Sequence, residues 1–122
     1  MYVYPSRLDG IGLTIPEALS SGLPVITTNN PPMNEFIKEN LNGSLISIKE
    51  YIKRGDNYYW PMAICDEVSL AKKMQFYVDN SKNIDTYKKD ARAYAEIHLD
   101  WRSNSKILLD FIEKIVQTRD CY

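Results

Sequence analysis

The sequence predicts an α/β fold, a half-size Rossmann-like domain with a short parallel sheet, flanking helices and a helical C-terminus. Three observations predict it. Strand-like and helix-like stretches alternate over residues 1–48. The spacing between these stretches suits right-handed crossovers, and nothing in this half is typical of a hairpin. Beyond residue 65, apolar residues recur at helical spacing.

The first half supplies the alternation. The expected order is strand, helix, strand, helix and strand, over residues 2–4, 14–20, 24–28, 33–39 and 44–48. The central strand is a continuous β-branched run, which is typical of a strand buried on both faces of a parallel sheet. Pro5, Ser21-Gly22 and Asn42-Gly43 are the breakers that separate the elements.

The second half is predicted to be helical after an irregular segment. We expect residues 49–65 to form a surface loop with one short edge strand near Tyr58. Three helices follow, each with an N-cap candidate: Asp66 before 67–78, Asn83 before a stripe of Ile84, Tyr87, Ala91 and Tyr94, and Asp100 before 101–117. The first of these helices is expected to pack through Leu70, Ala71, Met74, Tyr77 and Val78.

The last predicted helix is apolar on more than one side. Its apolar residues are Ile107, Leu108, Leu109, Phe111, Ile112, Ile115 and Val116. Such a helix usually packs against more than its own domain, so we expect a partner chain or self-association. The predicted division is a domain over residues 1–118 and a C-terminal tail over residues 119–122.

Composition excludes several function classes. Fifteen basic residues stand against sixteen acidic ones, for a net charge of −1. This balance argues against a nucleic-acid partner and against a polybasic membrane patch. No apolar run is long enough to span a bilayer, and no signal peptide follows Met1. Cys65 and Cys121 have no metal or redox spacing, which predicts reduced thiols in a cytoplasmic protein. The glycosylation pattern at residues 42–44 is then a chance match.

The residues between the first two predicted strands carry the chemistry. Gly10 and Gly12 form a loop between a strand and a helix, where the backbone can approach a ligand closely. A helix N-terminus offers N–H groups and partial positive charge to a phosphate. Asp9 and Glu17 flank the loop, and carboxylates accept hydrogen bonds strongly from sugar hydroxyls. The pattern indicates a nucleotide-sugar site.

This segment resembles the donor-site signature of the retaining, family-4-like group 1 glycosyltransferases of the GT-B fold. Asp9 and Glu17 have the family's eight-residue spacing between two acidic positions. The other matching positions are Gly10, Gly12, Leu13, Ala18, Gly22, Pro24, Val25 and Ile26. The resemblance is tight over residues 1–48, loose over 66–117 and absent over 49–65. It implies the C-terminal, donor-binding part of such an enzyme.

The resemblance also implies residue roles. Asp9 would contact the donor sugar, and Glu17 would take the ribose hydroxyls. The backbone of Gly10, Ile11, Gly12 and Leu13 would meet the sugar and the distal phosphate. Family members of this type need no metal ion or other cofactor, and they transfer the sugar with retention to an acceptor that the sequence does not identify.

Three departures from the family pattern limit these implications. Asp9 stands where the family usually has Glu, and Ile11 replaces an aromatic residue. The family's acceptor domain and first donor-domain strands do not precede Met1. We therefore expect the isolated chain to be weakly active or inactive.

Other interpretations stay open. Residues 14–17 fit a capping box, which would give Glu17 a structural role, and Asp9 can serve only to cap the glycine turn. A function of another class is a catalytically inactive nucleotide-sugar-binding or interaction module that needs an acceptor-domain subunit or a second copy. An unrelated small nucleotide-binding domain fits the strand–glycine–helix pattern but not the long motif.

Overall fold

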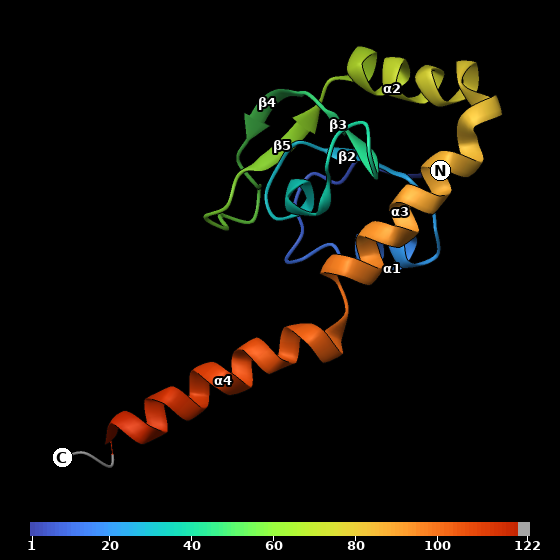
Figure 1. The fold of residues 1–122 in the computed structure, drawn as a ribbon. Coiled ribbons are helices and arrows are strands. Elements are labelled where there is room, and N and C mark those ends of the chain that lie inside the picture. Colours follow the sequence, from blue (N-terminus) through green and yellow to red (C-terminus); the bar gives the residue numbers. More distant parts are fainter. Residues whose placement is uncertain (120–122) are drawn as a thin grey trace.

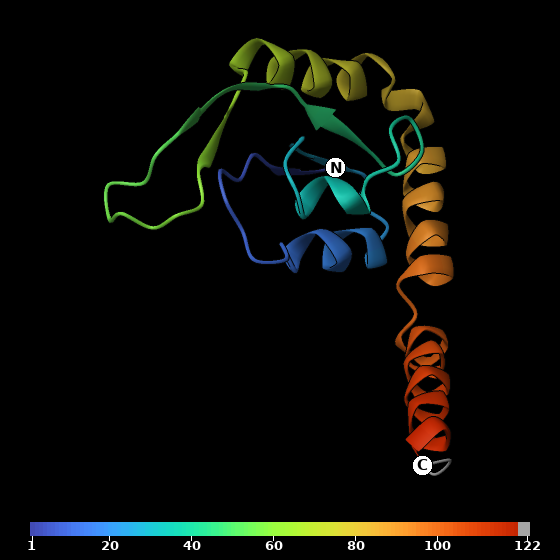
Figure 2. The same cartoon turned by 90° about the vertical axis from the view of Figure 1, so that its left-hand side faces the viewer.

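A computed structural model describes residues 1–119 and confirms the α/β prediction. Two sheets and several helices form the molecule, and a long C-terminal helix extends away from it (Figures 1 and 2). The elements in chain order are β1 (Tyr2–Tyr4), α1 (Thr14–Ser20), β2 (Val25–Thr28), η1 (Met33–Phe36), β3 (Gly43–Ile46), β4 (Ile48–Ile52), β5 (Met62–Cys65), α2 (Glu67–Asp79), η2 (Ser81–Asn83), α3 (Ile84–His98) and α4 (Trp101–Arg119).

The main sheet has the order β1-β2-β3, and both strand pairs are parallel. The central strand β2 is buried at all four residues, as its unbroken β-branched run predicts. Its register places Val25 beside Tyr2 on one side and beside Gly43 on the other. Because all three strands run in the same direction, their carboxyl ends lie at the same edge of the sheet.

The two faces of the sheet are covered by different helices, with α2 on one side and α1 on the other (Figure 1). Val25 joins a buried cluster with Ile15 of α1 and Ala91 of α3. Ile26, the next residue of β2, joins the opposite cluster with Tyr77 of α2. Successive strand residues point to opposite faces, so these two neighbours anchor the two layers.

The prediction of a surface loop over residues 49–65 is wrong, and so is the edge strand near Tyr58. Strands β4 and β5 form an antiparallel hairpin, with Ile48 beside Cys65 and Ile52 beside Met62. Tyr58 lies in the connecting turn, where its N–H donates to Asp56 Oδ1 at 3.1 Å. The strand pairing is irregular near Ile48, and this weakens the alternation that would have indicated a strand.

The helix expected over residues 33–39 ends early, as the 3₁₀ turn η1. The buried side chain of Asn42 explains the end. Its Oδ1 accepts from the Lys38 N–H at 2.7 Å, and its Nδ2 donates to the Phe36 carbonyl at 2.9 Å. These bonds replace the backbone bonds of a continuing helix. They also bury the amide of the glycosylation pattern, so the folded chain offers no acceptor there.

Two of the three predicted N-caps in the second half are confirmed. Asp66 accepts from the Ser69 N–H at 2.7 Å, and Asp100 accepts from the Ser103 N–H at 3.1 Å. Asn83 precedes α3 at the N-cap position, but its side chain makes no capping bond. The predicted stripe of α3 faces the protein, with Ala91 and Tyr94 buried and Ile84 and Tyr87 half-buried.

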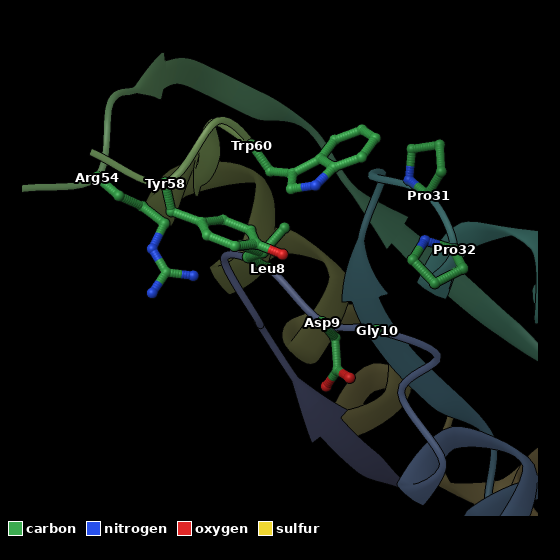
Figure 3. A pocket seen from close by; sticks show the side chains of 8 residues that line it. All are labelled: Leu8, Asp9, Gly10, Pro31, Pro32, Arg54, Tyr58 and Trp60. Carbon is green, nitrogen blue, oxygen red and sulfur yellow. The ribbon is translucent and has the colours of Figure 1, made fainter. Parts of the chain in front are cut away.

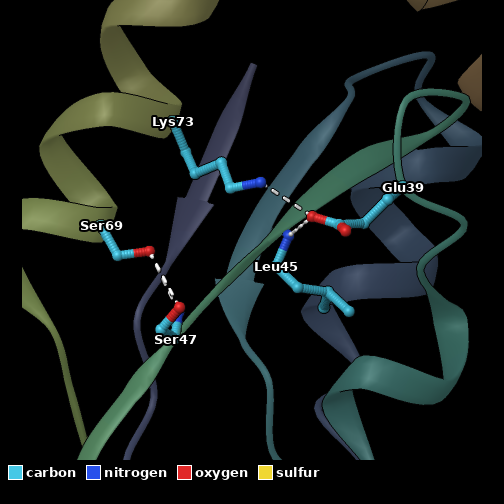
Figure 4. Close-up of polar contacts among 5 residues, drawn as sticks. All are labelled: Glu39, Leu45, Ser47, Ser69 and Lys73. Carbon is cyan, nitrogen blue, oxygen red and sulfur yellow. Dashed lines mark hydrogen bonds and ion pairs between the residues drawn. The ribbon is translucent and has the colours of Figure 1, made fainter.

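Polar contacts hold α2 against β3 (Figure 4). Glu39 Oε1 accepts from Lys73 Nζ at 2.8 Å and from the Leu45 N–H at 3.2 Å. The Ser69 hydroxyl accepts from the Ser47 N–H at 3.1 Å. The helix therefore contacts the sheet edge through Ser69, Lys73 and the buried Tyr77, which recur every four residues on one face.

The predicted apolar face of α2 is partly wrong for this reason. Leu70 is half-buried and Tyr77 is buried, but Ala71, Met74 and Val78 are exposed. The polar contacts at the edge of β3 rotate the helix away from the stripe that hydrophobic spacing alone predicts.

Glu39→Ala is expected to cost about 0.5–1 kcal/mol at pH 7, because its side chain is 45% exposed and solvent screens the pair with Lys73. The Lys73 ammonium, and then the Leu45 N–H, hold the pKa of Glu39 below its usual value. A lowered pKa stabilises the fold above the ordinary value and loses that effect as pH falls through the folded value. Urea unfolding of both proteins at pH 7 and pH 3 checks this.

Glu67→Ala is the matched control for that experiment. Glu67 pairs with Lys49 at 3.4 Å between more exposed side chains, and its removal should change the urea midpoint little. An undiminished cost of Glu39→Ala at pH 3 would contradict the assignment, since the protonated carboxyl no longer attracts Lys73.

Helix α4 carries exposed apolar side chains along its described length. They are Trp101, Ile107, Leu108, Leu109, Phe111, Ile112, Ile115 and Val116. Among residues 1–119, no helix has the length and apolarity needed to cross a membrane. Of the predicted tail at 119–122, only Arg119 is described, and it ends α4. Cys65 is a free thiol in β5, and Cys121 lies outside the described residues.

Candidate functional site

A cleft of about 750 Å³ opens at the carboxyl ends of the three parallel strands (Figure 3). Its walls come from three segments, which follow β1, β2 and β4 in turn. The lining residues are Leu8, Asp9, Gly10, Pro31, Pro32, Arg54, Tyr58 and Trp60. Open α/β sheets bind ligands in the crevice outside these strand ends, so the location itself marks a candidate site.

Asp9 is held by the loop to which it belongs. Its Oδ1 accepts from the N–H groups of Gly12 at 3.0 Å and Ile11 at 3.3 Å, and its Oδ2 accepts from the Tyr4 hydroxyl. The Tyr4 hydroxyl, followed by the backbone N–H groups, lowers the pKa of Asp9. These bonds use three of the roughly four acceptor positions of a carboxylate. Asp9 therefore caps the glycine turn, and these three bonds leave about one of its acceptor positions unused.

The two glycines of the loop have different roles. Gly12 has a φ of 73°, and a Cβ added there would lie 3.2 Å from Met33 Cγ. Its conformation and its packing both require glycine. A Cβ at Gly10 would meet nothing within 4 Å, and Gly10 lines the cleft. Gly12 thus shapes the turn, whereas Gly10 leaves space beside Asp9.

The predicted capping box at residues 14–17 is wrong. The N-cap of α1 is Leu13, and no side chain caps the helix. Residue Leu13 already has helical dihedral angles, and the Ile15 N–H donates to the Gly12 carbonyl at 2.8 Å, so the chain turns into the helix before Thr14. Glu17 lies in the first turn with an exposed side chain that makes no hydrogen bond within residues 1–119.

The cleft brings together only some of the predicted site residues. Asp9 and Gly10 line it, while Ile11, Leu13 and Glu17 are exposed at the start of α1 and are not among its lining. The predicted loop therefore contributes Asp9 and Gly10 to the cleft, whereas its later residues lead into α1.

Three further lining residues come from the β4–β5 turn, namely Arg54, Tyr58 and Trp60. Sequence analysis did not identify them, because it finds no clear resemblance over residues 49–65 and predicts a surface loop there. The aromatic run Tyr58-Tyr59-Trp60 was the available signal. Its exposure in the structure distinguishes it from core.

The turn is braced by charge pairing. Arg54 donates to both carboxylate oxygens of Asp56, at 3.1 Å from Nε and 2.6 Å from Nη2. Its guanidinium carbon also lies 4.8 Å from the centroid of the Tyr58 ring. The positive charge of Arg54 is thus already paired within the turn.

Two contacts fix the hairpin to the other walls of the cleft. The Ala63 N–H donates to the Arg7 carbonyl at 2.8 Å, which joins β5 to the loop after β1. The Tyr51 hydroxyl donates to Asn30 Oδ1 at 3.3 Å, which joins β4 to the segment after β2. The hairpin is therefore hydrogen-bonded to both of the other segments that form the cleft.

Parts of this chain are similar to known proteins. Residues 1–54 match the family "Glycosyl transferases group 1", so the prediction that the resemblance is absent over residues 49–65 is wrong for residues 49–54. The chain is 49% identical over 47 residues to the GtfA subunit of a UDP-N-acetylglucosamine–peptide N-acetylglucosaminyltransferase from Streptococcus agalactiae. The aligned residues make up 38% of this chain and 9% of that protein. It is 28% identical over 141 aligned residues to a sucrose synthase from Melioribacter roseus, which is 90% of this chain and 17% of the relative. The matched part is less than a fifth of either relative.

Proposed function

We propose that this chain binds the nucleotide-sugar donor of a glycosyl transfer reaction, because residues 1–54 match the family "Glycosyl transferases group 1". The observation that carries the proposal is the cleft at the three strand ends with Asp9 and Gly10 in its wall. A ligand-sized cleft lies where open α/β sheets bind nucleotides, and this supports the proposal independently of the motif.

We assign the sugar, the distal phosphate and the ribose of the donor to successive residues from Asp9 to Glu17. The sugar lies at Asp9, whose remaining acceptor position takes a hydroxyl. The N–H groups of Ile11 and Gly12 already donate to Asp9, so the distal phosphate meets the amides of Leu13 and Thr14 at the start of α1. The exposed carboxylate of Glu17 takes the ribose hydroxyls.

The proposed reaction retains the configuration of the sugar and uses no metal ion, with the leaving phosphate as the base. Asp9 and Glu17 bind the donor in this scheme and are not a glycosidase pair. The lowered pKa of Asp9 supports that role, because it favours the charged carboxylate that accepts a hydroxyl and opposes a general acid.

An acceptor has to be held beside the donor, and water has to be excluded. The described residues form one side of such a site. We therefore expect weak or no sugar transfer by the purified chain alone, and clear transfer in a product assay would contradict this.

Glu17→Ala should weaken nucleotide-sugar binding by about tenfold or more, since a hydrogen bond to a charged group contributes about 1.5–3 kcal/mol. The measurement is an NMR titration of ¹⁵N-labelled protein with UDP-, GDP- and ADP-sugars. Localised shifts of residues 10–17 that Glu17→Ala reduces would support the donor site and identify the nucleotide.

Glu113→Ala on α4 is the matched control, because it removes another exposed carboxylate, far from the loop in sequence. It should titrate like the unchanged protein. If millimolar ligand shifts no residue of the loop, the motif survives here only as part of the fold.

A second candidate function is a binding module that works with another chain. The exposed apolar side chains of α4 favour it, because this many large apolar groups are normally covered in a working assembly. The partner is either an acceptor-domain subunit or a second copy. Gel filtration with light scattering tests the second-copy form, and a well-behaved monomer would count against self-association. A cytoplasmic location stays a prediction.

A further inference from the structure

We propose that the β4–β5 turn forms an aromatic wall, made by Tyr58 and Trp60, against which the transferred sugar ring of the donor packs. The proposal rests on the proposed function and adds a contact outside the family motif. It gives the β4–β5 turn, in which Tyr58 and Trp60 lie beyond the matched residues 1–54, a direct role in choosing the sugar.

The wall and the carboxylate lie on different sides of one cleft. Tyr58 and Trp60 project from the hairpin toward the strand ends, and Asp9 and Gly10 lie across the cleft from them (Figure 3). Trp60 is 62% exposed, and Tyr58 is 56% exposed. A pyranose has a C–H face that packs on an aromatic ring and hydroxyls at its edge that a carboxylate accepts. The cleft offers both kinds of partner.

The charges of the turn favour the sugar over a phosphate. Arg54 is the one cationic residue among the described residues that line the cleft, and both carboxylate oxygens of Asp56 already pair with it. Asp9 adds negative charge to the same cleft, and this disfavours a phosphate further.

The position of the wall favours the sugar over the nucleobase. The ribose is assigned to Glu17, which lies outside the lining of the cleft, and the base is attached to that ribose. The hairpin instead shares its cleft with Asp9, which is assigned to the sugar. The sugar end of the donor is therefore the part within reach of Trp60.

The hairpin is organised before a ligand arrives. The bond from Ala63 to Arg7 and the bond from Tyr51 to Asn30 fix its strands, and Asp56 fixes its turn. A wall held in place loses little conformational entropy when the ligand binds.

The test compares each nucleotide-sugar with its free nucleoside diphosphate. Unchanged protein, Trp60→Ala, Tyr58→Ala and the control Tyr59→Ala are titrated by NMR with UDP-, GDP- and ADP-glucose and with UDP, GDP and ADP. Trp60→Ala and Tyr58→Ala should weaken the best nucleotide-sugar by about fivefold to tenfold and change its diphosphate less than twofold. Tyr59 is 96% exposed and does not line this cleft, so its replacement should change neither affinity.

A second measurement does not depend on the variants. With Trp101→Phe, Trp60 is the only indole, and we expect nuclear Overhauser contacts between its ring protons and the sugar C–H protons. Equal weakening of sugar-nucleotide and diphosphate, or unchanged affinity for both, would overturn the aromatic wall while leaving the donor site intact. Absence of binding by the unchanged protein would overturn the proposed function and this proposal together.

Discussion

Gly43→Ala should destabilise the protein by more than about 3 kcal/mol, a large part of the 5–15 kcal/mol that holds a typical domain folded. A Cβ at Gly43 would lie 2.2 Å from the Val25 carbonyl oxygen and 3.1 Å from its carbon. Both atoms are backbone of the central strand, which pairs with β1 and β3 and cannot move away from one without disturbing the other. Urea unfolding followed by far-UV circular dichroism measures the effect.

Gly55→Ala is the matched control, because a Cβ there meets nothing within 4 Å and the backbone needs no left-handed conformation. Its urea midpoint should stay unchanged or rise slightly, as alanine restricts the unfolded chain. A Gly43→Ala protein with the stability of the unchanged one would show that β2 and β3 do not pair as described.

The sequence predicted the structure closely where the local residue pattern favours a single backbone conformation. The run at residues 24–28 has no helical alternative in so short a space, and it forms β2 almost as predicted. The expected bounds of the helix at 14–20 are those of α1. The Asn42-Gly43 turn predicted a strand start, and β3 begins at that glycine. In each case the local pattern and the final packing demand the same conformation.

Prediction failed where bonds from outside a segment determine its structure. The end of η1 depends on the Asn42 side chain, which reaches back to Phe36 and Lys38. The hairpin depends on pairing across a long turn that lacks a short-turn signature, so periodicity in residues 48–52 alone did not reveal it. For the same reason, the sequence predicted Asp9 and Gly10 as site residues but did not predict Tyr58 and Trp60.

Asn42→Ala should cost about 2–4 kcal/mol, because it leaves two backbone groups without their partner. Asn42 is fully buried and joins the Lys38 N–H to the Phe36 carbonyl. Each group left unpaired in a buried place costs about 1–3 kcal/mol, and part of that is recovered from water because Lys38 is exposed. The measurement is again the urea midpoint, at pH 7, with unchanged protein alongside.

Asn42→Asp keeps the side-chain volume nearly unchanged and alters the hydrogen bonds, so it separates these two contributions to stability. The new carboxyl keeps the acceptor for the Lys38 N–H, but when ionised it sets an oxygen against the Phe36 carbonyl. Burial and that carbonyl raise the pKa of the new carboxyl in the folded state, since the protonated form donates as the amide did. A raised pKa stabilises the fold below the unfolded value and loses that effect as pH rises through the folded value. The variant should therefore approach the stability of the unchanged protein near pH 4 and fall behind at pH 7. A deficit that is the same at both pH values would mean that the amide fills space at this position without bridging the two backbone groups.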